Sequence, residues 1–439
     1  MNLPAELKAE VRQEMQASVV KQEPQEVLRP WQHGAIFLLS CALIVSRRPD
    51  AIFQAQFWNE DGHVFFADAY NFGWWPALFR TYEGYYHALP RLGAALALLA
   101  PLTLAPLVLN TIAICVQALA VNVLLCLRSS AWGSLRARFL LAGIYLALPN
   151  SFEMNATITN SQWILALIAF LLLVMPRPRN NMERVADVCV LLLCGLSGPF
   201  CIFLFPIALY AAWRHRERWR WVRAGLIFMT CLVQARSLLN GGFAGRPHVE
   251  LGANLVLLAR VLAGQLYLGS LFGVSPVAAF PGRWLATVLI AIAVGGTLYL
   301  SICFMRSREE MRLLLIFAGM ILAAAMIAPT PGQMGGTTFW WVALAHGSGA
   351  RYWYFPDLAL AWTIVGFAQS RTRSLQVISV ALLCVMSLGI ALRWEHPAFR
   401  DAHWAEYAKS FETAPAGTAV TIPESTPGWN LMLIKRASR

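Results

Sequence analysis

Residues 104–127 form one uncharged apolar stretch, LAPLVLNTIAICVQALAVNVLLCL. About 20 apolar residues in a helix are enough to cross the hydrocarbon core of a bilayer, so this stretch predicts a membrane span. Similar stretches recur along the chain, and we count about eleven, with an error of one or two because several are short. The predicted spans are residues 31–46, 104–127, 139–150, 162–175, 185–198, 200–213, 224–239, 283–304, 313–329, 355–369 and 375–392.

The composition of the whole chain also predicts an all-α polytopic membrane protein. Of the 439 residues, 58% are hydrophobic and 13% are charged, whereas a soluble protein has roughly 25% charged residues. This composition excludes soluble globular, disordered and disulfide-rich secreted proteins. The nine cysteines all lie in apolar segments, so they predict neither a disulfide framework nor a metal cluster. The expected partner is the lipid bilayer and not a nucleic acid, although the net charge is +12.

The arginines indicate the topology of the spans. Sixteen of the 31 arginines lie in five short loops, at residues 128–138, 177–184, 214–223, 306–312 and 371–373, and the alternate loops contain few. Because cytoplasmic loops carry an excess of Arg and Lys, these five loops are predicted to be cytoplasmic. We therefore expect a protein of the cytoplasmic (inner) membrane with its amino terminus inside, its carboxyl terminus outside and an odd number of spans.

The long connections all fall on the predicted external side, and the first of them covers residues 47–103. Two apolar stretches in these connections, 87–101 and 254–280, contain Arg91 and Arg260, and counting either stretch as a crossing would invert the arginine pattern. We interpret both as interfacial helices that lie against the outer leaflet. The three predicted parts of the chain are a cytoplasmic tail at 1–30, the transmembrane bundle at 31–392 and an external appendage at 393–439.

The first external loop opens with FWNEDGH at 57–63, in which the acids Glu60 and Asp61 are adjacent. Burial and mutual repulsion raise the pKa of one such carboxyl toward a value that suits a general base. Adjacent acids point in different directions on a helix, so one can face a substrate while its neighbour binds an arginine or a metal. Alternatively, both acids are solvated and cap the helix that begins at Val64.

The predicted spans lack acids at mid-depth: Asp187 lies at an inner edge and Asp357 near an outer edge. Ion-coupled carriers keep carboxylates or histidines in the middle of the membrane, where protons and cations are exchanged. The distribution of ionisable residues therefore favours chemistry at the outer surface and argues against a pore or a pump.

Three further groups on the external side could bind a substrate. The aromatic residues of 82–87 could stack on sugar rings, as could Trp74 and Trp75, although an interfacial belt explains these tryptophans better. Arg351 could grip a lipid phosphate through two hydrogen bonds, or could contact any phospholipid headgroup. The neutral polar run 155–163 could bind sugar hydroxyls, or could cap two helices.

The order of these features resembles the GT-C superfamily of integral-membrane glycosyltransferases, and within it a bacterial GT-C-like group. The shared features are an inside amino terminus, one span, a long external loop that opens with an acidic pair, interfacial helices and many further spans. Members of the superfamily use polyprenyl-phosphate-linked sugars at the outer face of the membrane. The resembling segments are short and lie at residues 58–62, 84–91, 159–163, 351–356, 422–423 and 427–429.

The resemblance implies an inverting glycosyltransferase that moves a sugar from a polyprenyl-phosphate-linked donor to a glycan or lipid acceptor. The catalytic acid of the superfamily falls on Glu60 or Asp61, and we expect Asp61 to be the base and Glu60 its partner. The base would deprotonate the acceptor hydroxyl, which would attack the anomeric carbon from the face opposite the lipid phosphate. The donor phosphate would bind Arg351, with Arg91 or Arg236 as competitors.

Members of the superfamily differ in metal dependence. If a metal is used here, Glu60, Asp61 and Asp68 offer the oxygen ligands that Mg²⁺ or Mn²⁺ prefers. The short C-terminal segment favours a small or lipid-linked acceptor. The residues expected to contact the sugar or the acceptor are Asn59, His63, Asp68, Tyr85, His87, Asn160, Gln162, Trp163 and Tyr352.

Other functions remain open at this point. A flippase or transporter of lipid-linked oligosaccharides would need a continuous hydrophilic cavity through the bundle, and a structural subunit would need no acidic pair. An O-antigen polymerase or ligase would share the external site but usually depends on loop arginines. Convergence of Glu60, Asp61 and Arg351 on one cavity that opens to lipid would favour the transferase.

Overall fold

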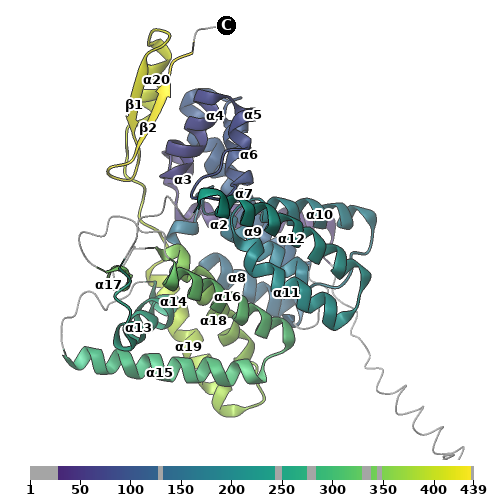
Figure 1. Ribbon diagram of the computed structural model, residues 1–439. Coiled ribbons are helices and arrows are strands. Elements are labelled where there is room, and N and C mark those ends of the chain that lie inside the picture. Colours follow the sequence, from purple (N-terminus) through teal and green to yellow (C-terminus); the bar gives the residue numbers. More distant parts are fainter. Residues whose placement is uncertain are drawn as a thin grey trace, which may run out of the picture.

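The computed structural model describes residues 28–126, 132–242, 250–273, 283–328, 338–343 and 349–436. Figure 1 shows a broad helical body with a narrower lobe above it. The lobe contains the first loop, defined here as residues 47–103, and the C-terminal segment. The predicted tail at 1–30 lies outside the described residues except for its last three positions, so this prediction is not tested.

Each of the eleven predicted spans is a helix in the structure. The boundaries agree to within a few residues, because uncharged apolar runs form helices whose ends are marked by arginines and turns. These helices are α2 (Pro30–Arg47), α7 (Ala105–Leu125), α8 (Leu135–Ala147), α9 (Ser161–Val174), α10 (Asn181–Gly195), α11 (Phe200–His215), α12 (Arg218–Ser237), α15 (Arg283–Arg306), α16 (Glu309–Ile327), α18 (Ala350–Phe367) and α19 (Arg373–Leu392).

Six helical segments of the described chain are long and apolar enough to cross a membrane, which indicates a multi-pass membrane protein. Three shorter apolar helices, among them α9 and α11, are below that length. The count of about eleven spans is therefore not confirmed and stays a prediction. The six segments are Leu102–Leu125, Arg218–Asn240, Leu255–Phe272, Ala286–Arg306, Glu309–Ile327 and Arg373–Leu392.

We interpreted two apolar stretches as interfacial helices. The structure departs from this interpretation at the second stretch. In the first, α6 (Ala88–Ala97) is a ten-residue helix, too short to span a bilayer by itself. In the second, Leu255–Phe272 is one helical segment that is long and apolar enough to span. It consists of α13 (Leu255–Val261), a π-helical stretch and α14 (Gly269–Phe272). Arg260, which argued against a crossing, therefore does not exclude one.

The helix α9 lies at the centre of the helical body. All fourteen of its residues are buried, and it packs against α7, α10 and α11. A helix that is buried along its whole length is surrounded by protein and not by lipid. This position explains why its polar first turn can form the wall of a site inside the protein.

Several arginines of the short loops bind the C-terminal ends of helices. The guanidinium of Arg138 donates to the carbonyl of Leu125, at the end of α7 (2.7 Å). Arg223 donates to the carbonyl of Met175, just after α9 (2.6 Å), and to Asp187 on α10 (2.6 Å). The last carbonyls of a helix lack partners within the helix and attract positive charge. These arginines therefore stabilise the fold by satisfying helix ends.

The first loop folds into a helical unit of its own. A buried ion pair joins Asp68 to Arg91 at 2.9 Å, and Arg80 lies 3.2 Å from the same carboxylate. The side chain of Arg91 is fully buried, so this pair fixes how the helix that carries Asp68 packs against α6. The helices are α3 (Asp50–Phe53), the π-helical η1 (Asp61–Phe66), α4 (Ala67–Phe72), α5 (Trp74–Leu78) and α6.

The C-terminal segment packs on the first loop as an ordered appendage, and its two strands depart from the all-α class that we predicted for the chain. After α20 (Trp404–Thr413), the strands β1 (Ala419–Pro423) and β2 (Asn430–Ile434) form an antiparallel hairpin. The alternation in β2 buries Leu431 and Leu433 and leaves the residues between and beside them exposed, so a single strand face drives the packing. In Figure 1 this hairpin stands beside α4.

Candidate functional site

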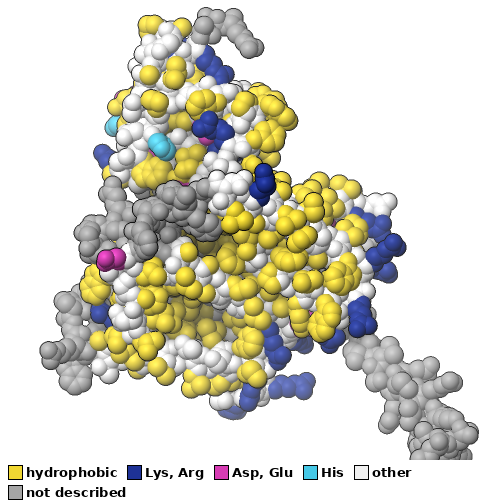
Figure 2. All heavy atoms as spheres, viewed as in Figure 1, with side chains coloured by type: hydrophobic (Ala, Val, Ile, Leu, Met, Phe, Trp, Pro, Cys, Tyr) yellow, Lys and Arg dark blue, Asp and Glu magenta, His cyan; other side chains and the backbone are white. Residues whose placement is uncertain are grey.

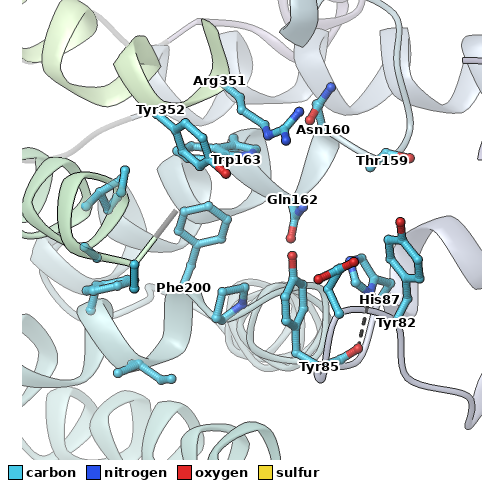
Figure 3. Close-up of a pocket in the computed structure, with 18 of the residues that line it drawn as sticks. Tyr82, Tyr85, His87, Thr159, Asn160, Gln162, Trp163, Phe200, Arg351 and Tyr352 are labelled. Carbon is cyan, nitrogen blue, oxygen red and sulfur yellow. Dashed lines mark hydrogen bonds between the residues drawn. The ribbon is translucent and has the colours of Figure 1, made fainter. Parts of the chain in front are cut away.

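A cavity of about 300 Å³ lies where the first loop meets α9, α11, α16 and α18. Figure 3 shows Arg351 and Tyr352 on one side of it and the first-loop residues Tyr82, Tyr85 and His87 on the other. The residues that line the cavity are Glu60, Tyr82, Glu83, Tyr85, His87, Thr159, Asn160, Gln162, Trp163, Pro199, Phe200, Ile202, Phe203, Leu238, Ile321, Ala324, Ala325, Ala328, Arg351 and Tyr352.

Glu60 is the member of the acidic pair that lines the cavity. It directly precedes η1, and the residue before it, Asn59, has a φ of +36°, so the chain turns sharply at this point. Burial raises the pKa of the Glu60 carboxyl above its usual range, and the positive charge of Arg351 opposes that rise. Glu60 thus binds a proton more tightly than an exposed glutamate does, which suits a general base.

Asp61 faces away from the cavity, into the protein. It is 1% exposed and accepts hydrogen bonds from the backbone N–H groups of Ile158 (3.3 Å) and Thr159 (2.9 Å) and from the Thr159 hydroxyl. Burial raises its pKa to about 7, although the hydrogen bonds from Thr159 oppose the rise. Asp61 therefore ties η1 to the segment before α9. The two acids do point in different directions, but the one we expected to be the base is the internal one.

Arg351, at the start of α18, provides the positive charge of the cavity. Its Nη1 lies 3.7 Å from the Oε2 of Glu153, and its backbone N–H donates to the same oxygen at 3.0 Å. Its guanidinium also lies over the ring of Tyr352, 5.2 Å from the centroid. Figure 3 shows the guanidinium reaching toward the cavity, near Asn160.

The walls beside these charges offer rings and neutral polar groups. Trp163 packs edge-on against Phe200, with 4.7 Å between ring centroids, and Tyr85 stacks on His87 at 4.5 Å. Burial and the nearby charge of Arg91 lower the pKa of His87 to about 3, so its ring is neutral. The side-chain oxygen of Gln162 has no hydrogen-bond partner among the described residues. These groups can bind a hydroxylated ring without adding charge.

The opposite part of the cavity is apolar. The start of α11 contributes Ile202 and Phe203, and the end of α16 with the residue that follows it contributes Ile321 and three alanines. The segment Glu309–Ile327, which is α16, is one of the six candidate spans. One cavity therefore joins a charged end to a wall that belongs to the membrane-embedded part of the chain.

The structure brings eight of the predicted site residues into the cavity, and leaves six outside its lining. The eight are Glu60, Tyr85, His87, Asn160, Gln162, Trp163, Arg351 and Tyr352. Asp61 and Asn59 adjoin Glu60 but do not line the cavity. The remaining four are Arg91, Asp68, His63 and Arg236.

Each of these four has another environment. Arg91 and Asp68 form the buried ion pair of the first loop, so Arg91 is not placed to bind a phosphate in the cavity. The Nδ1 of His63 lies 2.6 Å from the carbonyl oxygen of Asn430 in the hairpin. Arg236 is exposed near the end of α12.

Sequence reasoning missed several residues of the site. Tyr82, which belongs to the aromatic run 82–87 that we considered as a stacking platform, lines the cavity, and so does its neighbour Glu83, which we did not predict as a site residue. Glu153, which orients Arg351, lies just before the polar run 155–163. No sequence pattern indicated that it belongs to the site. Phe200 was hidden because a phenylalanine in an apolar helix looks like any core residue.

The described residues do not form a metal centre. Among them, no group of three or more histidine, cysteine, aspartate and glutamate side chains is arranged to hold an ion. Asp68, the third carboxylate that we considered as a ligand, is paired with Arg91 and Arg80. The donor set at Glu60 and Asp61 therefore does not fit Mg²⁺ or Mn²⁺ as these residues stand.

Comparison with known proteins adds no family to this description. No protein-family model matches the chain, and no curated protein matches it significantly.

Proposed function

We propose that this protein is a membrane glycosyltransferase that moves a sugar, with inversion, from a lipid-phosphate-linked donor to a hydroxyl acceptor. The observation that carries the proposal is the cavity itself. It combines a carboxylate, Glu60, and a guanidinium, Arg351, at one end with an apolar wall from α11 and α16 at the other. A donor with a charged phosphate, a sugar and a hydrocarbon chain matches each of these parts.

Arg351 would hold the donor phosphate. A guanidinium can donate two parallel hydrogen bonds to a phosphate, and the Glu153 carboxylate behind it fixes its direction. The hydrocarbon chain would leave along Ile321 and the alanines of α16, toward the surrounding lipid. The polyprenyl character of the lipid is the expectation that the resemblance to GT-C enzymes supplies.

Glu60, and not Asp61, would be the general base. In the proposed step the acceptor hydroxyl gives its proton to Glu60, and its oxygen forms a bond to the anomeric carbon of the sugar. The bond between that carbon and the phosphate oxygen breaks on the opposite face, and its electron pair leaves with the lipid phosphate. Arg351 stabilises the negative charge that develops on the leaving phosphate. Asp61 supports this step by anchoring the segment that carries Glu60.

We place the site at the outer face of the cytoplasmic membrane. Figure 2 shows Lys and Arg side chains gathered along the right and lower edges of the helical body, and further ones on the lobe that contains the first loop. If these arginine-rich edges face the cytoplasm, then Glu60 and the rest of the first loop face outward.

The proposal is tested by mass spectrometry of surface glycans and lipid-linked sugars in a deletion strain. We expect wild type to restore one sugar increment, Glu60→Gln not to restore it, and Glu406→Gln, a change at an exposed position of α20, to behave as wild type. Whole glycans that vanish while their lipid-linked precursors keep their mass would instead indicate a flippase, or a polymerase or ligase, and would overturn the proposal. Immunoblotting of membranes confirms that each variant is present.

A further inference from the structure

A third carboxyl group lies behind the acidic pair, and it comes from near the C-terminal end of the described chain. Glu424 follows β1 in the C-terminal hairpin and is 5% exposed. Neither of its carboxyl oxygens has a hydrogen-bond partner among the described residues. The backbone N–H of His63 favours the charged form of Glu424, but its hydrogen bond goes to the carbonyl of Asn59 (3.1 Å). A buried carboxyl without donors is far more stable as the neutral acid than as the anion.

The contact between Glu424 and the first loop is close. A Cβ atom added to Gly62 would lie 2.3 Å from the Oε1 of Glu424, so this oxygen rests directly on the glycine. Neighbouring contacts hold the same corner: the Ser425 hydroxyl donates to the carbonyl of Phe57 (2.8 Å). The hairpin thus covers the back of the turn that points Glu60 into the cavity.

The charged neighbours of Glu424 are acids. Asp61 and Glu60 both raise its pKa, in addition to the larger effect of burial, and together these effects bring it to about 9. The ring of His63 is turned to the hairpin carbonyl of Asn430 and to Trp429. Asp61 accepts three hydrogen bonds, whereas the carboxyl oxygens of Glu424 accept none that meets the same geometry within the described part of the chain. The negative charge is therefore more stable on Asp61 and the proton on Glu424.

We propose that Glu424 is a positioning residue for the Glu60 base: as a neutral acid, it seats the hairpin against Asp61 and Gly62 and thereby fixes the direction of Glu60. This inference rests on the proposed function. A charged Glu424 at this place would repel Asp61 and Glu60 and would lift the hairpin from the first loop. The hairpin therefore contributes to the geometry of the site, although it does not line the cavity.

The pH dependence follows from the direction of the shift. Glu424 binds its proton more tightly when the hairpin is packed against the first loop than when it is detached. The packed state of the hairpin is therefore most stable at acidic pH. It weakens as the pH rises from the ordinary range of a glutamate, about 4.3, to about 9. Over this interval the equilibrium for opening rises by up to tenfold per pH unit, since one proton is released.

The test compares the full-length protein in lipid nanodiscs with Glu424→Gln and with the control Glu406→Gln. Hydrogen-exchange protection factors are measured for amides of 57–66 and 419–434 between pH 5 and pH 9. We expect protection to fall with rising pH in wild type and in the control, and to fall less steeply in Glu424→Gln, because the amide cannot ionise whereas Asp61 and Glu60 still can. Equal slopes in all three proteins would overturn the inference.

A second readout uses the pH profile of sugar transfer. Glu424→Gln should keep its kcat at alkaline pH where wild type loses it, with the KM for the donor unchanged. An alkaline loss of kcat that is the same in both proteins would contradict a positioning role for Glu424. Hydrogen exchange does not require catalytic turnover. If the proposed transferase activity is wrong, the exchange experiment therefore still tests whether Glu424 controls the packing of the hairpin.

Discussion

The Nη1 of Arg351 and the Oε2 of Glu153 lie 3.7 Å apart, and the same oxygen accepts the backbone N–H of Arg351. One carboxylate thus holds both the start of α18 and the guanidinium that this helix carries. Since the Glu153 side chain is largely buried, the pair is only weakly screened by water. The arrangement keeps the charge of Arg351 in place before any ligand binds.

Arg351→Lys should therefore weaken the donor site although it keeps the positive charge. A lysine cannot donate two parallel hydrogen bonds to a phosphate, and a hydrogen bond to a charged group contributes about 1.5–3 kcal/mol. We expect kcat/KM for the donor to fall roughly 10- to 100-fold. Steady-state kinetics with the purified protein measures this change, and an unaltered kcat/KM would remove Arg351 from donor binding.

The acidic pair should separate into two roles. Glu60→Gln should abolish transfer and leave the melting temperature unchanged, because Glu60 faces the cavity. Asp61→Asn should lower both the rate of transfer and the melting temperature, because an amide cannot accept all the hydrogen bonds from Ile158 and Thr159. Residual transfer is expected in Asp61→Asn and not in Glu60→Gln. The reverse order of activities would restore Asp61 as the base.

The activity should require an ionised Glu60. Because burial raises the pKa of this carboxyl, the fall of kcat/KM on the acid side should begin above the usual pKa range of glutamate. The sign follows from the role of a base, which works only when it is deprotonated. A pH–rate profile between pH 4 and pH 8 checks this, and an acid limb below the normal glutamate range would be inconsistent with Glu60 as the base.

The buried pair of Asp68 and Arg91 should contribute to stability and not to donor binding. Asp68→Asn leaves the fully buried Arg91 without a counter-charge, and breaking a buried ion pair costs about 3–5 kcal/mol. The exposed partner Arg80 is the matched control, and Arg80→Ala should cost less than about 1 kcal/mol. Thermal unfolding in detergent compares the two variants, and equal melting temperatures would contradict the burial argument.

The proposed sidedness can be checked by labelling introduced cysteines with a membrane-impermeant maleimide. A cysteine at the exposed position Glu406 should react in intact cells, and one at the exposed position Arg214 should react only after permeabilisation. The parent protein with its native cysteines provides the background signal. Labelling of Arg214→Cys in intact cells would show that the arginine-rich loops are not cytoplasmic.

The sequence allowed the helices to be predicted better than the site. Apolar runs such as 104–127 are decisive over twenty or more residues, so the helix positions followed directly. The side to which Asp61 points depends on hydrogen bonds with Thr159, almost a hundred residues away, and no local pattern reports such a contact. The hairpin at 419–434 was not predicted as strands, because its short alternation follows a segment rich in Pro, Thr and charged residues.

The bond from the Ser425 hydroxyl to the carbonyl of Phe57 joins residues 368 positions apart. The corner that carries Glu60 can close only after the chain between these two residues has been inserted and folded. Closing so long a loop is entropically costly and slow. The order of assembly therefore makes this corner one of the last parts to form, and an incompletely assembled protein would have its helices in place without a competent site.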